Sequence, residues 1–223
     1  KGFLEECDFS FRRRVEEAAN RIINRTAESP IVLLSGPSGV GKSTVISELL
    51  GQRQDIHFSV SFTTRQPRVG EANGVNYNFV DRPEFERMIA DGELLEHAEY
   101  VGNYYGTSLK VIEEKLAAGI DVLLDIEVQG AAKVRAKCPE AVLIFIIPPS
   151  FEELSRRLHG RHTDGEDVIA GRLQKAREEY KEIPHYDYLV VNDKVSEAAA
   201  EIISILVAEG CRTRNRIHLV EGV

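Results

Sequence analysis

The most chemically informative part of the sequence is a glycine-rich run, SGPSGVGKST, at residues 35–44. Residues 36–43 match the pattern GxxxxGK[ST], in which backbone N–H groups and a helix N-terminus converge on phosphate oxygens. Lys42 would place a positive charge on the β- and γ-phosphates, and the Ser43 hydroxyl would coordinate Mg²⁺. The pattern therefore predicts a site for a nucleoside triphosphate. The residues expected to line it are Gly36, Pro37, Ser38, Gly39, Val40, Gly41, Lys42, Ser43 and Thr44.

The residues on either side supply the elements that such a loop needs. Residues 31–34 are apolar, as is typical of a buried parallel strand, and residues 45–50 predict a helix that ends at Gly51. A plain glycine-rich turn is the alternative interpretation. The strand–loop–helix context favours the phosphate site, because the motif requires that context.

The composition limits the function classes. With 223 residues and 43% hydrophobic content, the chain suits one compact domain with a sizeable core. A formal net charge of −8 argues against non-specific nucleic-acid binding, and no apolar run approaches the ~20 residues that would span a bilayer. We therefore expect neither a nucleic acid nor a membrane as a partner. The three cysteines lie far apart and form no metal-ligand pair, which favours a reducing compartment.

Helix and strand signals alternate along the chain, and four or five continuous apolar strands predict an α/β fold with a doubly wound parallel sheet. Strands are expected at residues 31–34, 56–62, 94–100, 120–126, 141–147 and 188–191. Helices are expected at residues 45–50, 81–91, 109–118 and 131–137. A capping box at residues 150–153 opens a further helix, a long helix runs through Tyr180, and a final helix runs from a Ser196 cap to about Glu209.

Residues 1–29 precede the first core strand. They are too acidic for a transit peptide, and we interpret them as an extension that packs on the surface or forms an interface. Because the first residue is Lys1 and not Met, we expect a start that is truncated, processed or fused. We expect residues 211–223 to form a C-terminal tail of undetermined role.

A second polar cluster follows the predicted strand at 56–62. Arg65 and Arg68 lie three residues apart beside hydroxyl groups, and Tyr77 comes soon after. Two guanidinium forks and a phenol hydroxyl suit a phosphate monoester dianion.

Glu96 lies in the segment LLEHAEY, and its carboxylate is chemically suited to recognise a guanine base through hydrogen bonds. A carboxylate accepts hydrogen bonds from the N1–H and N2–H₂ donors of guanine together, whereas adenine presents an acceptor at N1. A site built on buried hydrogen bonds discriminates by ~10⁴-fold or more, because the wrong base leaves groups unpaired. The alternative for Glu96 is a solvated carboxylate at the end of a strand.

From about residue 30 to about residue 209 the sequence resembles the guanylate kinases, which phosphorylate GMP with ATP. The resemblance rests on the P-loop and on the motifs TTRxPRxGExNGxxYxF, LLExAxxxGNxYGT, LLDIExQGA, RRLxGRxT and DYLVVND. It implies a P-loop domain over residues 30–210, with a GMP-binding insert at about 61–112 and a mobile lid at about 155–172.

The resemblance also implies residue roles. The GMP site would comprise Ser61, Arg65, Arg68, Tyr77, Glu96, Tyr105, Thr107, Asp125 and Glu127. The residues that neutralise charge on the transferring group would be Lys42, Arg157, Arg161 and Arg172. Ser43 and Asp125 would hold Mg²⁺, and Asn192 would lie beside the adenine.

Two positions depart from the family pattern. Glu127 stands where many relatives carry Asp, so its role stays open: an outer position around the metal, a hydrogen-bond partner of guanine or arginine, or an ion pair with Arg65 or Arg68. His162 occupies a place that is commonly glycine, which would stiffen or tilt the turn of the lid.

The leading hypothesis is an ATP:GMP phosphotransferase that uses Mg²⁺ and also accepts dGMP. Such an enzyme would serve purine nucleotide synthesis and GMP recycling. We expect a cytoplasmic protein that is a monomer or homodimer. A guanylate-kinase-like module that docks peptides is the second hypothesis. Such modules typically have a degraded P-loop or lid, whereas this chain keeps both. A kinase for another nucleoside monophosphate is the third, and Ser61 and Glu96 argue against it.

Overall fold

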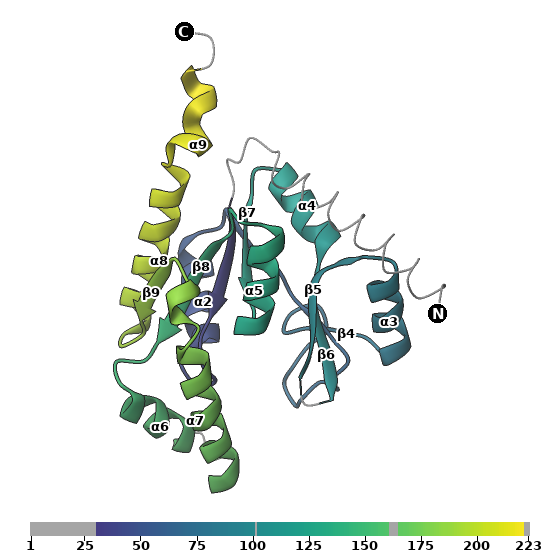
Figure 1. The fold of residues 1–223 in the computed structure, drawn as a ribbon, viewed down its shortest axis with the longest axis vertical. Helices are drawn as coiled ribbons and strands as arrows, with labels where there is room; N and C mark the ends of the chain where they lie inside the picture. The colour runs from purple at the N-terminus through teal and green to yellow at the C-terminus, as the bar shows by residue number, and fades with distance from the viewer. Residues whose placement is uncertain (1–29, 101, 161–164, 221–223) are drawn as a thin grey trace.

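Strand β1 (Ile31–Ser35) lies at the centre of a five-stranded sheet with the order β2-β7-β1-β8-β9. The computed structural model describes residues 30–100, 102–160 and 165–220 (Figure 1). The other strands are β2 (Ile56–Phe58), β7 (Asp121–Asp125), β8 (Val142–Ile147) and β9 (Tyr188–Val191). Each pair of neighbours is parallel, so the predicted doubly wound parallel sheet is confirmed.

Helices cover both faces of this sheet, which explains why its strands are continuous apolar runs. Side chains of β1 alternate between the faces. Val32 and Leu34 pack with helices α2 (Lys42–Gln52) and α8 (Val195–Gly210). Ile31 and Leu33 pack with α4 (Leu109–Ala117) and α5 (Val128–Lys137).

A second sheet has the order β4-β3-β6-β5, with strands β3 (Phe62–Thr63), β4 (Asn78–Phe79), β5 (Leu94–Tyr100) and β6 (Asn103–Ser108). Helix α3 (Arg82–Ala90) covers it through Phe85, whose ring stacks on Tyr104 with centroids 5.3 Å apart. Helices α4 and α5 lie between the two sheets (Figure 1).

Several element predictions need correction. The single strand expected at 56–62 is wrong, because the chain leaves the parallel sheet after Ser59 and enters the second sheet at Phe62. Strand β6 was not predicted, since its sequence NYYGTS lacks an apolar pattern and its pairing with β5 defines it. Helix α8 begins with Lys194 as its N-cap, so Ser196 lies inside the first turn and is not the cap. Helix α5 begins at Val128, one turn earlier than expected.

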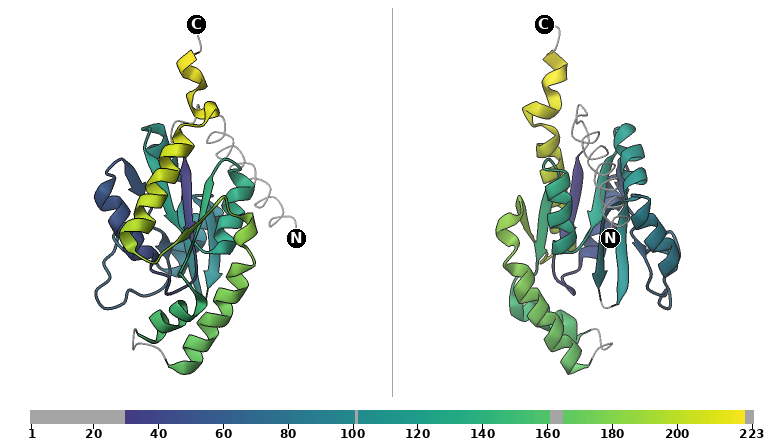
Figure 2. Two further views of the ribbon diagram at one scale, coloured as in Figure 1. Left: turned by 90° about the vertical axis from the view of Figure 1, so that its left-hand side faces the viewer. Right: turned by 45° about the vertical axis from the view of Figure 1, so that its right-hand side comes forward.

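Helices α6 (Phe151–His159) and α7 (Glu166–Tyr180) lie at one end of the molecule with a small apolar cluster of their own (Figure 2). The predicted cap of α6 is present, because Ser150 Oγ accepts a hydrogen bond from the backbone N–H of Glu153 at 3.1 Å. A 3₁₀ turn, η1 (Ile183–His185), precedes β9, and α9 (Thr213–Arg216) and η2 (Ile217–Val220) extend from the opposite end of the molecule.

Among the described residues, no helix has the length and apolar character needed to span a bilayer. The expectations for the extension at residues 1–29, for Arg161 and for His162 fall outside the described residues.

Candidate active site

The loop between β1 and α2 takes a path that only glycine permits at two points. At Gly36, with φ 152°, a Cβ atom would lie 2.4 Å from the backbone oxygen of Ile146. At Gly41, with φ 95°, it would lie 2.7 Å from Nδ2 of Asn192. The loop is therefore packed tightly against β8 and the chain that follows β9.

Lys42, the first residue of α2, joins the two ends of this loop. Its Nζ donates to the carbonyl oxygen of Gly36 at 2.7 Å and lies 3.9 Å from Oδ1 of Asp125. A cation bound to the backbone at the start of the loop is placed to contact the phosphates that the loop would enclose.

Asp125 ends strand β7, next to β1, at the edge where parallel sheets of this kind bind ligands. Burial raises the pKa of its carboxyl group, Lys42 opposes that rise, and Glu127 adds to it. The side chain is still 32% exposed, so a ligand can reach it.

The oxygen donors of Ser43 and Asp125 suit Mg²⁺, which takes one or two protein ligands together with phosphate oxygens and water. Among the described residues, no group of three or more His, Cys, Asp or Glu side chains could hold a metal ion. Two such donors would leave most of the coordination positions of Mg²⁺ to phosphate oxygens and water.

Glu127 forms its ion pair with Lys175 of α7, at 2.8 Å, and not with either arginine proposed from the sequence. The same ammonium group lies 3.6 Å from Oε1 of Glu179, a side chain that is nearly buried. Lys175 and Glu179 were missed in the sequence because their charges look like an ordinary solvated helix face.

Three residues predicted to bind the GMP phosphate lie together on the second sheet. The guanidinium of Arg65 lies 5.4 Å from the ring centroid of Tyr77, and the ring centroids of Tyr77 and Tyr105 are 5.9 Å apart. Burial raises the pKa of Tyr77, and the charge of Asp125 contributes to the rise.

Glu71 organises the two arginines, although its role was not recognised in the sequence. One terminal nitrogen of Arg65 donates to both carboxylate oxygens of Glu71 at 2.9 Å, and the backbone N–H of Arg68 donates to Oε2 at 2.8 Å. The signal was present in the sequence as a single acidic residue three positions after Arg68.

Glu96 is buried, with only 5% of its surface exposed, so its interpretation as a solvated carboxylate is wrong. The hydroxyl of Thr107 donates to its Oε1 at 2.7 Å, because Glu96 and Thr107 are paired across β5 and β6. Burial raises the pKa of Glu96. Ser61 lies just before β3, and its carbonyl accepts from the backbone N–H of Asn78 at 2.8 Å.

Two arginines of the helix pair α6 and α7 reach the glycine-rich loop. Arg157 donates to the carbonyl oxygens of Val40 at 3.2 Å and Asn192 at 3.0 Å, while Arg172 donates to Ser38 Oγ at 2.9 Å. Glu153 accepts from Nε of Arg157 at 2.7 Å and thereby orients it.

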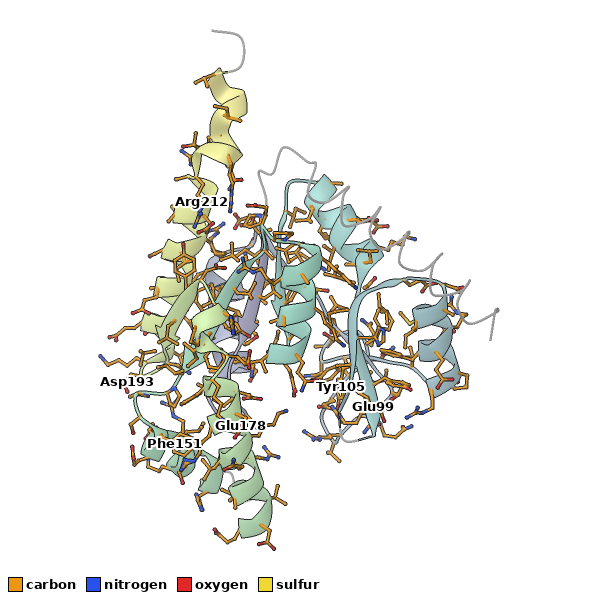
Figure 3. All side chains as sticks on the ribbon, viewed as in Figure 1. Glu99, Tyr105, Phe151, Glu178, Asp193 and Arg212 are labelled. Carbon is orange, nitrogen blue, oxygen red and sulfur yellow. The ribbon has the colours of Figure 1, made fainter. Side chains whose placement is uncertain are left out.

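The side chain of Asn192, expected beside the adenine, lies against the loop instead of in the open. It is 2% exposed, and its Nδ2 donates to the carbonyl oxygen of Val40 at 2.7 Å. Its neighbour Asp193 is exposed, at the turn before α8 (Figure 3).

Comparison with known proteins adds independent information. The family model described as guanylate kinase matches residues 27–209. A guanylate kinase of Desulfitobacterium hafniense is 49% identical over 193 residues, covering 86% of this chain and 96% of that protein. A guanylate kinase of Shouchella clausii is 52% identical over 187 residues, covering 84% and 91%.

A solved structure is also similar. The crystal structure of guanylate kinase from Anaplasma phagocytophilum superimposes with a TM-score of 0.73 at 41% identity, covering 86% of this chain and 92% of that one.

Proposed function

The chain belongs to the guanylate kinase family, and on that premise we propose that it transfers the γ-phosphoryl group of MgATP to GMP, giving GDP and ADP. The observation that carries the proposal is the buried carboxylate of Glu96, held by Thr107, in a chain that also has a complete phosphate-binding loop. The proposal includes dGMP as a second acceptor and a place in purine nucleotide synthesis and GMP recycling. It also includes a cytoplasmic location.

The acceptor would bind to the second sheet. Arg65, Arg68 and Tyr77, with Tyr105, would hold the phosphate of GMP, while Ser61, Glu96 and Thr107 would read the guanine. The support is that Glu71 already accepts a hydrogen bond from the Arg65 guanidinium at 2.9 Å and one from the backbone N–H of Arg68 at 2.8 Å, so the Arg65 side chain loses little freedom when the phosphate binds.

The donor would bind at the glycine-rich loop. Backbone N–H groups and Lys42 would hold the triphosphate, and Arg157 and Arg172 would approach from α6 and α7 to neutralise charge on the transferring group. Arg161 is assigned the same role from the sequence alone. For Asn192, its hydrogen bond with Val40 supports a role in shaping the loop next to the adenine.

Mg²⁺ would be held by Ser43 and Asp125, and it would neutralise phosphate charge during the transfer. Asp125 lies at 3.9 Å from Lys42, so both charges would act at one point between donor and acceptor. Glu127 pairs with Lys175, which argues against the ion pair with Arg65 or Arg68 that the sequence left open. The roles that remain for Glu127 are an outer position around the metal and a hydrogen bond to guanine.

We propose a domain at residues 30–210, with the GMP-binding insert at about 61–112 and the lid at about 155–172. The second sheet with α3 and the helix pair α6 and α7 correspond to these two segments. The chain would act as a monomer or homodimer, with GMP and ATP as small-molecule partners.

A coupled ADP-release assay with GMP, dGMP, AMP and UMP tests the proposal. We expect turnover with GMP and dGMP, and with AMP a kcat/KM lower by ~10⁴-fold or more. An absence of turnover with every acceptor would favour a docking module, and a preference for AMP or UMP would favour another nucleoside monophosphate kinase.

A further inference from the structure

Two lysines of α5 bind the backbone of β5 on both sides of Glu96. The ammonium group of Lys133 donates to the carbonyl oxygen of His97 at 2.6 Å, and that of Lys137 donates to the carbonyl oxygen of Leu95. Helix α5 packs on the parallel sheet, whereas β5 is the edge strand of the second sheet. The two lysines therefore cross the boundary between the sheets.

The spacing of the donors matches the spacing of the acceptors. Carbonyl groups two residues apart lie roughly 6.6 Å apart in an extended strand. The pairing of β5 with β6 shifts register between Leu94 and Glu96, and the carbonyl groups of Leu95 and His97 both face the lysines. Residues four apart on one helix face are separated by a rise of roughly 6 Å. Strand β6 pairs with one edge of β5, and the lysines occupy the other edge, with which no strand pairs among the described residues.

The same face of α5 approaches the carboxylate itself. A Cβ atom at Gly130, one turn before Lys133, would lie 3.1 Å from Oε2 of Glu96. Gly130, Lys133 and Lys137 thus form one line of residues along the face of α5 that contacts β5. The carboxylate of Glu96 lies at the Gly130 end of this line. A shift of β5 along this line would move the carboxylate away from its place beside Thr107.

We propose that Lys133 and Lys137 are positioning residues for base selectivity, which hold Glu96 where it reads the guanine. The proposal rests on the proposed function, in which Glu96 accepts hydrogen bonds from the guanine base. The lysines need not touch the nucleotide, because they act through the backbone of β5.

The lysines also favour the charged form of the carboxylate. Burial raises the pKa of Glu96, and the charges of Lys133 and Lys137 lower it. Of the other elements packed on β5, β6 contributes the Thr107 hydroxyl. On the remaining sides α3 and α4 pack apolar side chains against it: Phe85, Met88, Leu109 and Ile112. On β5 itself, burial and the two lysines lower the pKa of His97.

The test compares the wild-type protein with Lys133→Met, Lys137→Met and the double variant. Lys110→Met is the matched control, since that lysine lies on neighbouring α4 and its side chain is 83% exposed. For the double variant we expect KM for GMP to rise about tenfold, the size of one lost charge-assisted hydrogen bond, with KM for ATP unchanged. Each single variant should show a smaller rise of the same kind.

Two readouts separate positioning from a general loss of structure. Preference for GMP over IMP, which lacks the 2-amino group, should fall about tenfold as Glu96 loses its alignment. The acid limb of kcat/KM for GMP should move to higher pH, because Glu96 without the lysines takes up a proton more readily. Titration of the GMP phosphate is common to all variants and cancels in the comparison. Lys137→Arg, which keeps charge and donor, should restore most of the preference.

The proposal is overturned if folded variants keep the wild-type preference for GMP over IMP and the wild-type acid limb, or if KM rises equally for ATP and GMP. If the double variant does not fold, the single variants decide in the same way. Failure of the proposed function would appear differently, as a wild-type protein that does not phosphorylate GMP.

Discussion

The ammonium group of Lys175 lies 2.8 Å from Oε2 of Glu127, and this ion pair joins α7 to the N-terminus of α5. Helix α7 also carries Arg172, which reaches the glycine-rich loop through Ser38. Because Glu127 follows Asp125 by two residues, the ion pair ties the arginine-bearing helix to the edge of the sheet where phosphoryl transfer is proposed. The position of Arg172 therefore depends on a contact that itself lies outside the loop.

Replacing this lysine tests the connection. We expect Lys175→Met to lower kcat about tenfold, the loss of one positioned charged group, with a smaller change in KM for GMP. Lys181→Met, at the end of the same helix and exposed, is the control. Steady-state kinetics with saturating ATP measures the difference. A drop in GMP affinity with unchanged kcat would show instead that Lys175 serves the acceptor site.

Lys42→Ala should lower turnover by about 10³-fold or more, because a charge aimed at the β- and γ-phosphates is lost at the transition state. The thermal unfolding midpoint should change little, since the ammonium group is bound by the loop carbonyl of Gly36 and lies beside Asp125, outside the apolar core. Exposed Lys194→Ala is the control for loss of a surface lysine. Wild-type turnover in purified Lys42→Ala protein would contradict the assignment as an enzyme of this class.

Glu96→Gln should weaken GMP and leave ATP affinity nearly unchanged. The amide keeps one acceptor and turns a donor toward the donors of guanine, so we expect a loss of ~2–4 kcal/mol in kcat/KM. Glu99→Gln, an exposed residue on the same strand, is the matched control. Equal GMP kinetics before and after the change would show that Glu96 does not read the base.

Asp125→Asn should separate stability from activity. Burial raises the pKa of Asp125, so the folded protein binds its proton at pH values where the unfolded chain has lost it. Stability from this group therefore falls as pH rises above the ordinary Asp value of about 4. The asparagine, neutral at every pH, should raise the free energy of unfolding near pH 7 and give no gain near pH 3, while turnover falls.

Urea unfolding at the two pH values measures this effect, with exposed Asp193→Asn as the control. Equal pH dependence of stability in wild-type and Asp125→Asn proteins would show that the folded protein does not raise this pKa.

The second sheet and the helix pair α6 and α7 should move toward each other when both nucleotides bind. Their arginines would be drawn by phosphate groups, so closure should require phosphates and not the bases alone. Fluorescence transfer between labels at residues 80 and 160 measures it, after replacement of Cys7 and the exposed Cys211. We expect a shorter distance with a linked GMP–ATP mimic than with guanosine and adenosine. An unchanged distance would refute ligand-driven closure.

Elements whose signals are local were predictable from the sequence. The glycine-rich loop follows an apolar strand and precedes a helix within about twenty residues, and the structure has this order at β1 and α2. Helix α3 begins where Asp81 and Pro83 indicate, since a cap acts on the residues next to it. The parallel sheet followed from strands too apolar to face water on either side.

Elements defined by pairing were not predictable in this way. Strand β6 has polar residues and glycine, and it becomes a strand because β3 and β5 bind its two edges. The break between β2 and β3 likewise depends on two different sheets. The recognised motifs identified Glu96 and Thr107 as a set, but that Glu96 is buried and bound by Thr107 is a property of the folded sheet.

The partners of the charged side chains were decided only by the tertiary structure. Lys175 is 48 residues from Glu127, Lys137 is 42 residues from Leu95, and Arg157 is 117 residues from Val40. The partners of these residues could not be predicted from the sequence, even for Arg157, whose importance the family motifs indicated. Helical periodicity shows which residues share a face but not which residues that face contacts. Local preferences determine the strands, helices and loop, whereas long-range ion pairs and hydrogen bonds form only once both sheets and the helices between them are packed.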